Sequence, residues 1–236
     1  MKANLFIITL FILLTACNDN YSQTQKRPGN DIKVGGECEG CEAIHETPVP
    51  FSKLSDVDTL EDFSRGINLL EVSGRVLKSD GKTPAAGIVL YIYHTDHAGI
   101  YPVRGNEKGW ERRHGYLRGW VKTSPNGEYK FLTARPASYP NSTAPAHIHC
   151  IVKETGINEY YIGDFLFDDD PFVTSAEKKS TTRPGGNGVI KLRRSGNRLI
   201  AERNIYLGKN VLNYPISTNT SAIESGLVLG MDMIRF

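Results

Sequence analysis

The feature that most restricts the fold of this chain is a series of short strand-like runs, each closed by a turn. From about Gly66 onward, alternating or β-branched and aromatic runs follow one another at short intervals. For example, "RGWVKT" and "EYKFLT" flank "SPNG", in which Asn126-Gly127 is a strong hairpin signal. No strong helical pattern interrupts the series. The sequence therefore predicts an all-β fold, an antiparallel β-sandwich of about 7–9 strands with little helix.

Composition and charge agree with this prediction and limit the partners. The 23 glycines and 12 prolines among 236 residues favour turns and short strands over long helices. A net charge of +2 gives no field for nucleic acid, so we expect no nucleic-acid partner. We expect the sandwich to span residues 66–215, after a polar tether and N-terminal segment at 17–65. The extension at 216–236 is either an extra edge strand or an oligomer contact, so a homo-oligomer is an open alternative.

Residues 1–16 predict an export signal. A single lysine precedes an apolar run from Leu5 to Leu14, which is too short for a bilayer span of about 20 residues. Such a run is typical of the h-region of a secretory signal. The ending "LTAC" resembles the lipobox of bacterial lipoproteins, which implies cleavage before Cys17, a lipid on Cys17, and an exported, membrane-anchored protein on the periplasmic or cell-surface side. Ordinary secretion with an unmodified Cys17 is the alternative.

The remaining cysteines fit an oxidising compartment. Cys38 and Cys41 lie in "CEGC", which predicts a local disulfide. A zinc ribbon would need a second cysteine pair, and a thioredoxin-like site would need a βαβ pattern around the motif. Cys150 is then left as a free thiol that we expect in the core.

Two histidines in "APAHIHCIVK" are the strongest chemical signal. His147 and His149 share one face of a predicted strand, because successive side chains of a strand point to opposite faces. Two imidazoles aimed the same way predict a metal site, and the alternative is that each bonds to a backbone carbonyl. No histidine follows His149, so any further ligands must come from earlier in the chain.

The stretch "LRGWVKTSPNGEYKFLTARPASYP", followed by "APAHIHCIVKE", resembles the intradiol ring-cleavage dioxygenases, the group that contains protocatechuate 3,4-dioxygenase and catechol 1,2-dioxygenase. The segment "LYIYHTDHAGIY" is similar to the family's region around its first ligand tyrosine. "IGDFLFDDDP" is similar to the family's strand after the histidines. The resemblance covers roughly Gly66 to Pro215.

The resemblance implies an Fe(III) site and a reaction. The ferric ligands fall on Tyr101, Tyr139, His147 and His149, with both tyrosines also catalytic. Phenolate oxygen favours ferric iron over softer metals. The implied reaction uses O2 to cleave a catechol-type ring between its two hydroxyl groups, which gives a muconate-type diacid.

One position departs from the family pattern. Where the family places an arginine, three residues before the first ligand histidine, this chain has Ala144. The candidates for a substitute cation are Arg104, Arg113, Arg118 and Arg135. The other strand tyrosines are expected to pack with their hydroxyls in water, namely Tyr91, Tyr93, Tyr129, Tyr160 and Tyr161.

Two other functions stay open at this point. "VSGRVLKSDGKTPAAGIVLYIY" also resembles the transthyretin-like or carboxypeptidase-regulatory sandwich, which implies a non-enzymatic surface binding module without need of the tyrosines or histidines. A copper or zinc site could instead use His94, His97, His147 and His149.

Overall fold

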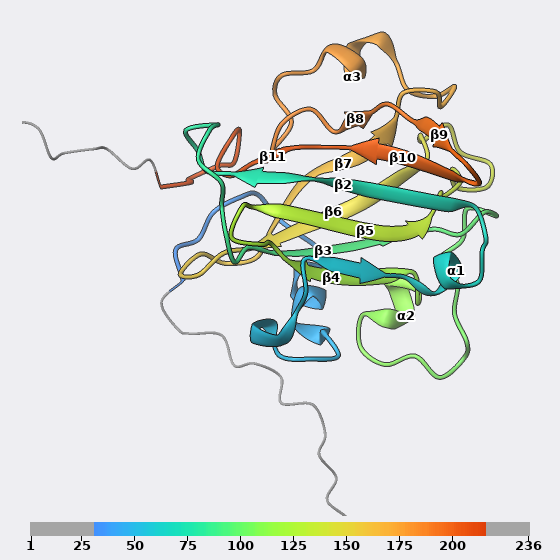
Figure 1. Cartoon of the computed structure of the whole chain (residues 1–236), viewed down its shortest axis with the longest axis horizontal. Coiled ribbons are helices and arrows are strands. Elements are labelled where there is room, and N and C mark those ends of the chain that lie inside the picture. The colour runs from blue at the N-terminus through green and yellow to red at the C-terminus, as the bar shows by residue number, and fades with distance from the viewer. Residues whose placement is uncertain (1–30, 216–236) are drawn as a thin grey trace, which may run out of the picture.

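The computed structural model describes residues 31–215, so the predicted signal at 1–16, the lipidation site Cys17 and the extension at 216–236 lie outside the described residues. Two stacked β-sheets make up most of this part (Figure 1). The strands of the first sheet are β1 (Val57–Thr59), β2 (Leu69–Leu77), β5 (Glu128–Ala134), β9 (Arg193–Ser195), β10 (Arg198–Glu202) and β11 (Ile205–Tyr206). The strands of the second sheet are β3 (Val89–His94), β4 (Arg118–Lys122), β6 (His147–Lys153), β7 (Tyr160–Phe167) and β8 (Val189–Ile190).

The helices of the described chain are short. The α-helices are α1 (Glu61–Ser64), α2 (Glu111–His114) and α3 (Ser175–Lys179), and the 3₁₀ helices are η1 (Cys41–Glu46) and η2 (Phe51–Lys53). Within residues 31–215, none has the length and apolar character that a membrane crossing needs. The prediction of a mostly β fold with little helix is therefore confirmed.

The prediction of a purely antiparallel sandwich of seven to nine strands is wrong. Eleven strands occur in the described chain, and both sheets are mixed. The order is β1-β5-β2-β10-β9 in the first sheet, with β11 also on β2, and β4-β3-β6-β7-β8 in the second. β1 pairs with β5, β8 with β7, and both β10 and β11 with β2 in parallel, whereas β10 and β9 are antiparallel. Parallel neighbours need long connections, which local turn signals do not reveal.

The main core lies between the two sheets. Alternate side chains of β2 and β6 fill this space, as the period of two requires. They include Leu70, Val72, Ile148, Cys150 and Val152. Cys150 is a free, buried thiol as predicted, and burial raises its pKa to about 12. His147 and His149 therefore project from the opposite face of β6.

The N-terminal segment covers part of that opposite face. Cys38 and Cys41 are joined by a disulfide at the start of η1. Cys41, Ala43 and Ile44 pack against side chains of the second sheet, and Trp120 Nε1 donates to the Ile44 carbonyl at 2.9 Å. In Figure 1 this blue segment lies at the bottom of the view, with α3 at the top. Because β1 also pairs with β5, the folded region begins before the expected boundary at residue 66.

Replacing Ile44 tests whether this segment is an integral part of the fold. Ile44 is fully buried, so Ile44→Ala should lower the free energy of unfolding by about 2–5 kcal/mol through lost contacts and a cavity. Val49, which is 41% exposed, gives a control, since Val49→Ala should change stability by no more than about 0.5 kcal/mol. Urea denaturation measures both. Equal stability of the two variants would show that the segment is not docked.

Candidate metal centre

Four side chains from three parts of the chain direct one polar atom each toward a common centre. The Tyr101 hydroxyl lies 2.6 Å from the Tyr139 hydroxyl and 3.0 Å from His149 Nε2. His147 Nε2 lies 3.2 Å from the Tyr139 hydroxyl and 3.1 Å from His149 Nε2. The structure thus brings the four residues implied by the family resemblance into one closed ring of donor atoms, which we call the four-atom ring.

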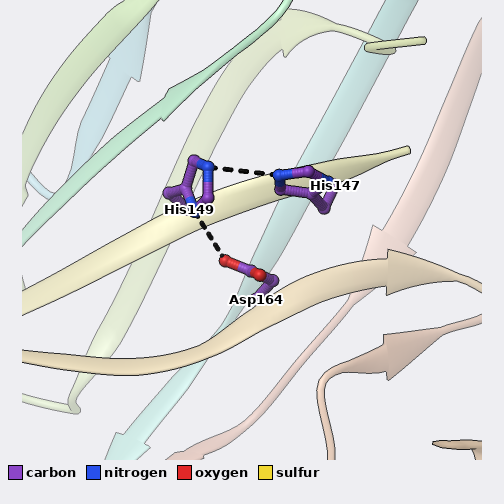
Figure 2. Close-up of side chains that lie close together, drawn as sticks. All are labelled: His147, His149 and Asp164. Atoms are coloured by element: carbon purple, nitrogen blue, oxygen red, sulfur yellow. Dashed lines mark hydrogen bonds and ion pairs between the residues drawn. The ribbon is translucent and has the colours of Figure 1, made fainter. Parts of the chain in front are cut away.

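The outer nitrogens of both histidines are already occupied. His147 Nδ1 lies 2.7 Å from the Pro145 carbonyl, which can only accept, so Nδ1 carries the proton. His149 Nδ1 lies 2.9 Å from Asp164 Oδ1, and a carboxylate likewise favours the proton on Nδ1. Figure 2 shows the two histidines on β6 and Asp164 on the neighbouring strand β7. As neutral imidazoles, the two histidines would therefore present lone pairs to each other at Nε2.

Hydrogen bonds alone cannot satisfy the four-atom ring. It has four contacts of 2.6–3.2 Å, but the two phenols bring only two protons. Two contacts are consequently left without a proton between them. A cation among the four atoms would convert every lone pair into a ligand. Ligand atoms about 2.0–2.1 Å from an ion lie about 3.0–3.4 Å apart, close to the spacings seen here. The residues present fit a metal ion.

Asp164 is a part of this centre that the sequence analysis missed. Its carboxylate groups with His147 and His149, the ligand atoms of the three residues lying within 4.8 Å of one another. Since it contacts Nδ1 of His149, it sits behind that imidazole, on the side away from the four-atom ring. Ligating histidines commonly direct their second ring nitrogen at a carboxylate or carbonyl, and here His147 faces the Pro145 carbonyl and His149 faces Asp164.

A β-bulge aims Asp164 at His149. Ile148 pairs with Phe165 and Cys150 pairs with Ile162, so β7 has one more residue than β6 between these pairs. Ile162 and Phe165 are therefore both buried in the core, and Asp164 turns to the histidine face. Bulges often re-aim a side chain beside an active site. A glycine and an aspartate inside the apolar run "YYIGDFLF" are the sequence signal for this bulge.

The loops that carry the two tyrosines are tied to each other. Thr95 Oγ1 donates to the Ala137 carbonyl at 2.7 Å, and the Ala137 amide donates to the Asp96 carbonyl at 3.0 Å. Between them, Gly99 has a φ of +76°, and a Cβ at this position would lie 2.0 Å from the carbonyl oxygen of Ser138. The loop before Tyr101 thus approaches the residue before Tyr139 as closely as only glycine permits.

Comparison with known proteins settles the family. The sequence profile of the family described as "Dioxygenase" matches residues 52–204, more than half of the chain. The chain belongs to this dioxygenase family. The chain is 31% identical over 121 residues to hydroxyquinol 1,2-dioxygenase of Rhizobium sp. (strain MTP-10005), covering 44% of this chain and 39% of that relative.

Two other dioxygenases are also similar to this chain. The protocatechuate 3,4-dioxygenase beta chain of Burkholderia cepacia is 28% identical over 43% of this chain and 46% of the relative. Catechol 1,2-dioxygenase 1 of Acinetobacter lwoffii is 27% identical over 51% of this chain and 42% of the relative. The chain spans less than half the length of each of these relatives. The expected family is confirmed by the match over residues 52–204.

An aromatic layer supports the ring of His149. Tyr93 stacks on His149 with ring centroids 4.5 Å apart, and on its other side it stacks on His114 at 3.7 Å. The Tyr91 hydroxyl lies 2.8 Å from His114 Nδ1, and Tyr91 is fully buried. The expectation that the strand tyrosines keep their hydroxyls in water is wrong for Tyr91, because the N-terminal segment covers the outer face of the second sheet. It is also wrong for Tyr129 and Tyr160, whose buried hydroxyls donate to the Arg203 carbonyl and to Glu154.

Burial sets the protonation of the metal-free centre. Burial raises the pKa of the Tyr101 phenol, and the contact with Tyr139 raises it further. Burial lowers the pKa of His147, with His149 as a second cause. Burial acts to raise the pKa of Asp164, but the contact with His149 outweighs it and the pKa is lowered. Neutral phenol, neutral imidazole and ionised carboxylate are the resulting forms at neutral pH.

The expected copper or zinc site built with His94 and His97 is wrong. His94 is buried with Nδ1 2.7 Å from the Thr95 carbonyl and Nε2 2.7 Å from Thr133 Oγ1, so neither nitrogen is free to bind a metal. His97 is exposed. Within residues 31–215, the metal-compatible group of His, Cys and acidic side chains comprises His147, His149 and Asp164.

The four candidate arginines all have acidic partners. Arg118 pairs with Glu46 at 2.7 Å, and Arg135 pairs with Asp169 at 2.7 Å. The other two pairs are Arg104 with Glu61 and Arg113 with Glu39. Each guanidinium is thus engaged by an acid, and within residues 31–215 no hydrogen bond or ion pair joins one to the four-atom ring.

Gly99 provides a test of the loop contact. Gly99→Ala should abolish stoichiometric metal binding, because the new Cβ must displace Ser138 and with it Tyr139. Gly105 is a matched control, since it also has a positive φ of +94° but nothing within 4 Å of its Cβ position. Gly105→Ala should cost about 1–2 kcal/mol of backbone strain and retain the metal. Metal content after dialysis and thermal unfolding report both effects. Retention of metal by both variants would contradict the assignment.

Proposed function

We propose that this chain is a non-haem iron intradiol dioxygenase that cleaves a catechol-type ring between its two hydroxyl groups with O2, yielding a muconate-type diacid. The observation that carries the proposal is the four-atom ring, in which two phenols and two imidazoles make four close contacts with two protons. Membership of the dioxygenase family supports it, as do relatives named for hydroxyquinol, protocatechuate and catechol.

The donor set favours ferric iron. Phenolate oxygens are hard, anionic ligands, and two of them with two neutral imidazoles leave a trivalent ion with a single positive charge. Tyr101, Tyr139, His147 and His149 would hold the ion. When bound, ferric iron would take up the two oxygens of a catechol and activate the ring toward O2.

The chain's own residues handle protons and orientation. A catechol must lose two protons when it binds. Within the four-atom ring, the groups that can accept them are the phenol oxygens of Tyr101 and Tyr139. Tyr139, the base implied by the family resemblance, lies 2.6 Å from Tyr101, so a proton taken at one oxygen can pass to the other. The Pro145 carbonyl and Asp164 keep both imidazoles oriented.

We also propose that the protein works outside the cytoplasm, attached to a membrane through a lipid on Cys17. The lipobox-like ending of the N-terminal signal supports this placement. The disulfide between Cys38 and Cys41 agrees with an oxidising compartment.

Ferric reconstitution tests the activity. The protein with bound iron should be coloured by tyrosinate-to-iron charge transfer, and its visible band should shift when a simple catechol is added without O2. On admitting O2, mass spectrometry should find a ring-opened diacid that contains both atoms of ¹⁸O2. A protein that stays colourless and iron-free after reconstitution would contradict the proposal.

Removal of single phenol oxygens should have a graded optical effect. Tyr101→Phe and Tyr139→Phe should each weaken the charge-transfer band and lower turnover by at least about 100-fold, since each removes a ligand and a base. Tyr206 in β11 of the other sheet is the control, because Tyr206→Phe removes a hydroxyl away from the ring. Loss of colour in Tyr206→Phe, or an unchanged charge-transfer band in both Tyr101→Phe and Tyr139→Phe, would argue against the assignment.

Iron binding should release protons. A tyrosine phenol is protonated at neutral pH, whereas lowering of the pKa of His147 by burial leaves that imidazole neutral. Two protons should therefore leave per ion bound near pH 7, so affinity should fall as the pH falls. Calorimetry in buffers of different ionisation enthalpy measures this number. Tyr139→Phe should release about one proton fewer, and an unchanged number would count against Tyr139 as a phenolate ligand.

A further inference from the structure

Arg203, between β10 and β11, is a buried cation with no hydrogen-bond partner in the described structure. Its exposure is 3%, and none of its three guanidinium nitrogens has a partner among residues 31–215. The main chain around it is well satisfied, because its carbonyl accepts from Tyr129 and its amide donates to Ser73. An uncompensated charge in such a place is strongly destabilising, so a counter-charge must lie near.

The guanidinium lies against the bulge of β7. Its central carbon is 4.3 Å from the ring centroid of Phe165, the residue after Asp164. A Cβ on Gly188 would lie 3.3 Å from that same carbon and 1.9 Å from the carbonyl oxygen of Asp164. The absence of a side chain at Gly188 therefore lets the arginine reach the strand that carries Asp164.

Asp164 is the negative charge available there. Burial lowers the pKa of Arg203, and Cys150, Tyr129, Asp164 and Tyr161 act in the opposite direction. Burial raises the pKa of the Cys150 thiol to about 12 and raises the pKa of both tyrosines, so these three groups are neutral at pH 7. The Oδ1 atom of Asp164 is itself buried and has no hydrogen-bond partner among residues 31–215, although it lies 2.9 Å from His149 Nδ1 as an ion pair.

We propose that Arg203 is a positioning residue of the metal centre, whose buried charge compensates Asp164 and so holds that carboxylate against Nδ1 of His149. The order of charges is then guanidinium, carboxylate, imidazole and metal, running from the core between the sheets outward. The effect on the metal rests on the proposed function, whereas the charge pair is a property of the metal-free chain.

A double-mutant cycle on the metal-free protein tests the pair. The variants are Arg203→Met, which keeps an apolar side chain over Phe165, Asp164→Asn and the combination of both. Each single change leaves one buried charge alone, and the combination removes both. The folding equilibrium constant of the double variant should exceed the value expected from the two single effects by about tenfold or more. Additive effects would overturn the charge pair.

Ferric affinity, measured in competition with nitrilotriacetate, shows whether Arg203 positions Asp164 at the metal centre or only packs in the core. Asp164→Asn should weaken iron binding about 10–100-fold, and Arg203→Met should do the same alone but add nothing once Asp164→Asn is present. Arg203→Lys should retain most of the affinity. Arg198→Met, which removes an arginine of β10 that pairs with Glu71 of β2, should leave the affinity unchanged.

Two results would be decisive against this inference. If Arg203→Met destabilised the fold equally with and without Asp164→Asn, Arg203 would contribute by packing alone and not through Asp164. Unchanged iron affinity in Arg203→Met would remove its role at the metal. A wild-type chain that binds no iron would instead overturn the proposed function, and the cycle on the metal-free proteins would still decide for or against the charge pair.

Discussion

The contact between two imidazole Nε2 atoms 3.1 Å apart is the constraint on which the rest of the site depends. Both outer nitrogens already face acceptors, so two neutral imidazoles would have no proton to place between the inner nitrogens. Adding two phenols does not resolve this, because four contacts still share two protons. The arrangement is one of four lone pairs around a centre, which a cation stabilises and hydrogen bonds alone do not.

Much of the fold serves to hold these four atoms. The period of two in β6 buries Ile148 and Cys150 and so turns both histidines outward together. The bulge in β7 brings Asp164 behind His149, and Tyr93 stacks on its ring. The disulfide-bonded N-terminal segment closes the same face of the second sheet, packing against Trp120 and its neighbours. The four donor atoms are therefore held by three parts of the chain, namely β6 and the two loops that carry the tyrosines.

The sequence predicts those features that repeat locally. Strand alternation places His147 and His149 on one face, and the family resemblance supplies Tyr101 and Tyr139, which no periodicity could connect. Asp164 escapes prediction because an extra residue in β7 reverses the alternation just before it. Arg203 escapes because "AERNIYL" suits an exposed strand end, and only the stacking of two sheets buries it. Parallel edge strands such as β1 and β8 escape because their partners are distant in the chain.

Resonance Raman spectroscopy of the iron-loaded protein tests the central claim most directly, because excitation in the visible band enhances only vibrations of groups bonded to the metal. The account predicts tyrosinate ring modes from two inequivalent phenolates, one set lost in Tyr101→Phe and the other in Tyr139→Phe. Survival of both sets of tyrosinate modes in either single variant, or a loaded protein without any such modes, would contradict a centre built on these two oxygens.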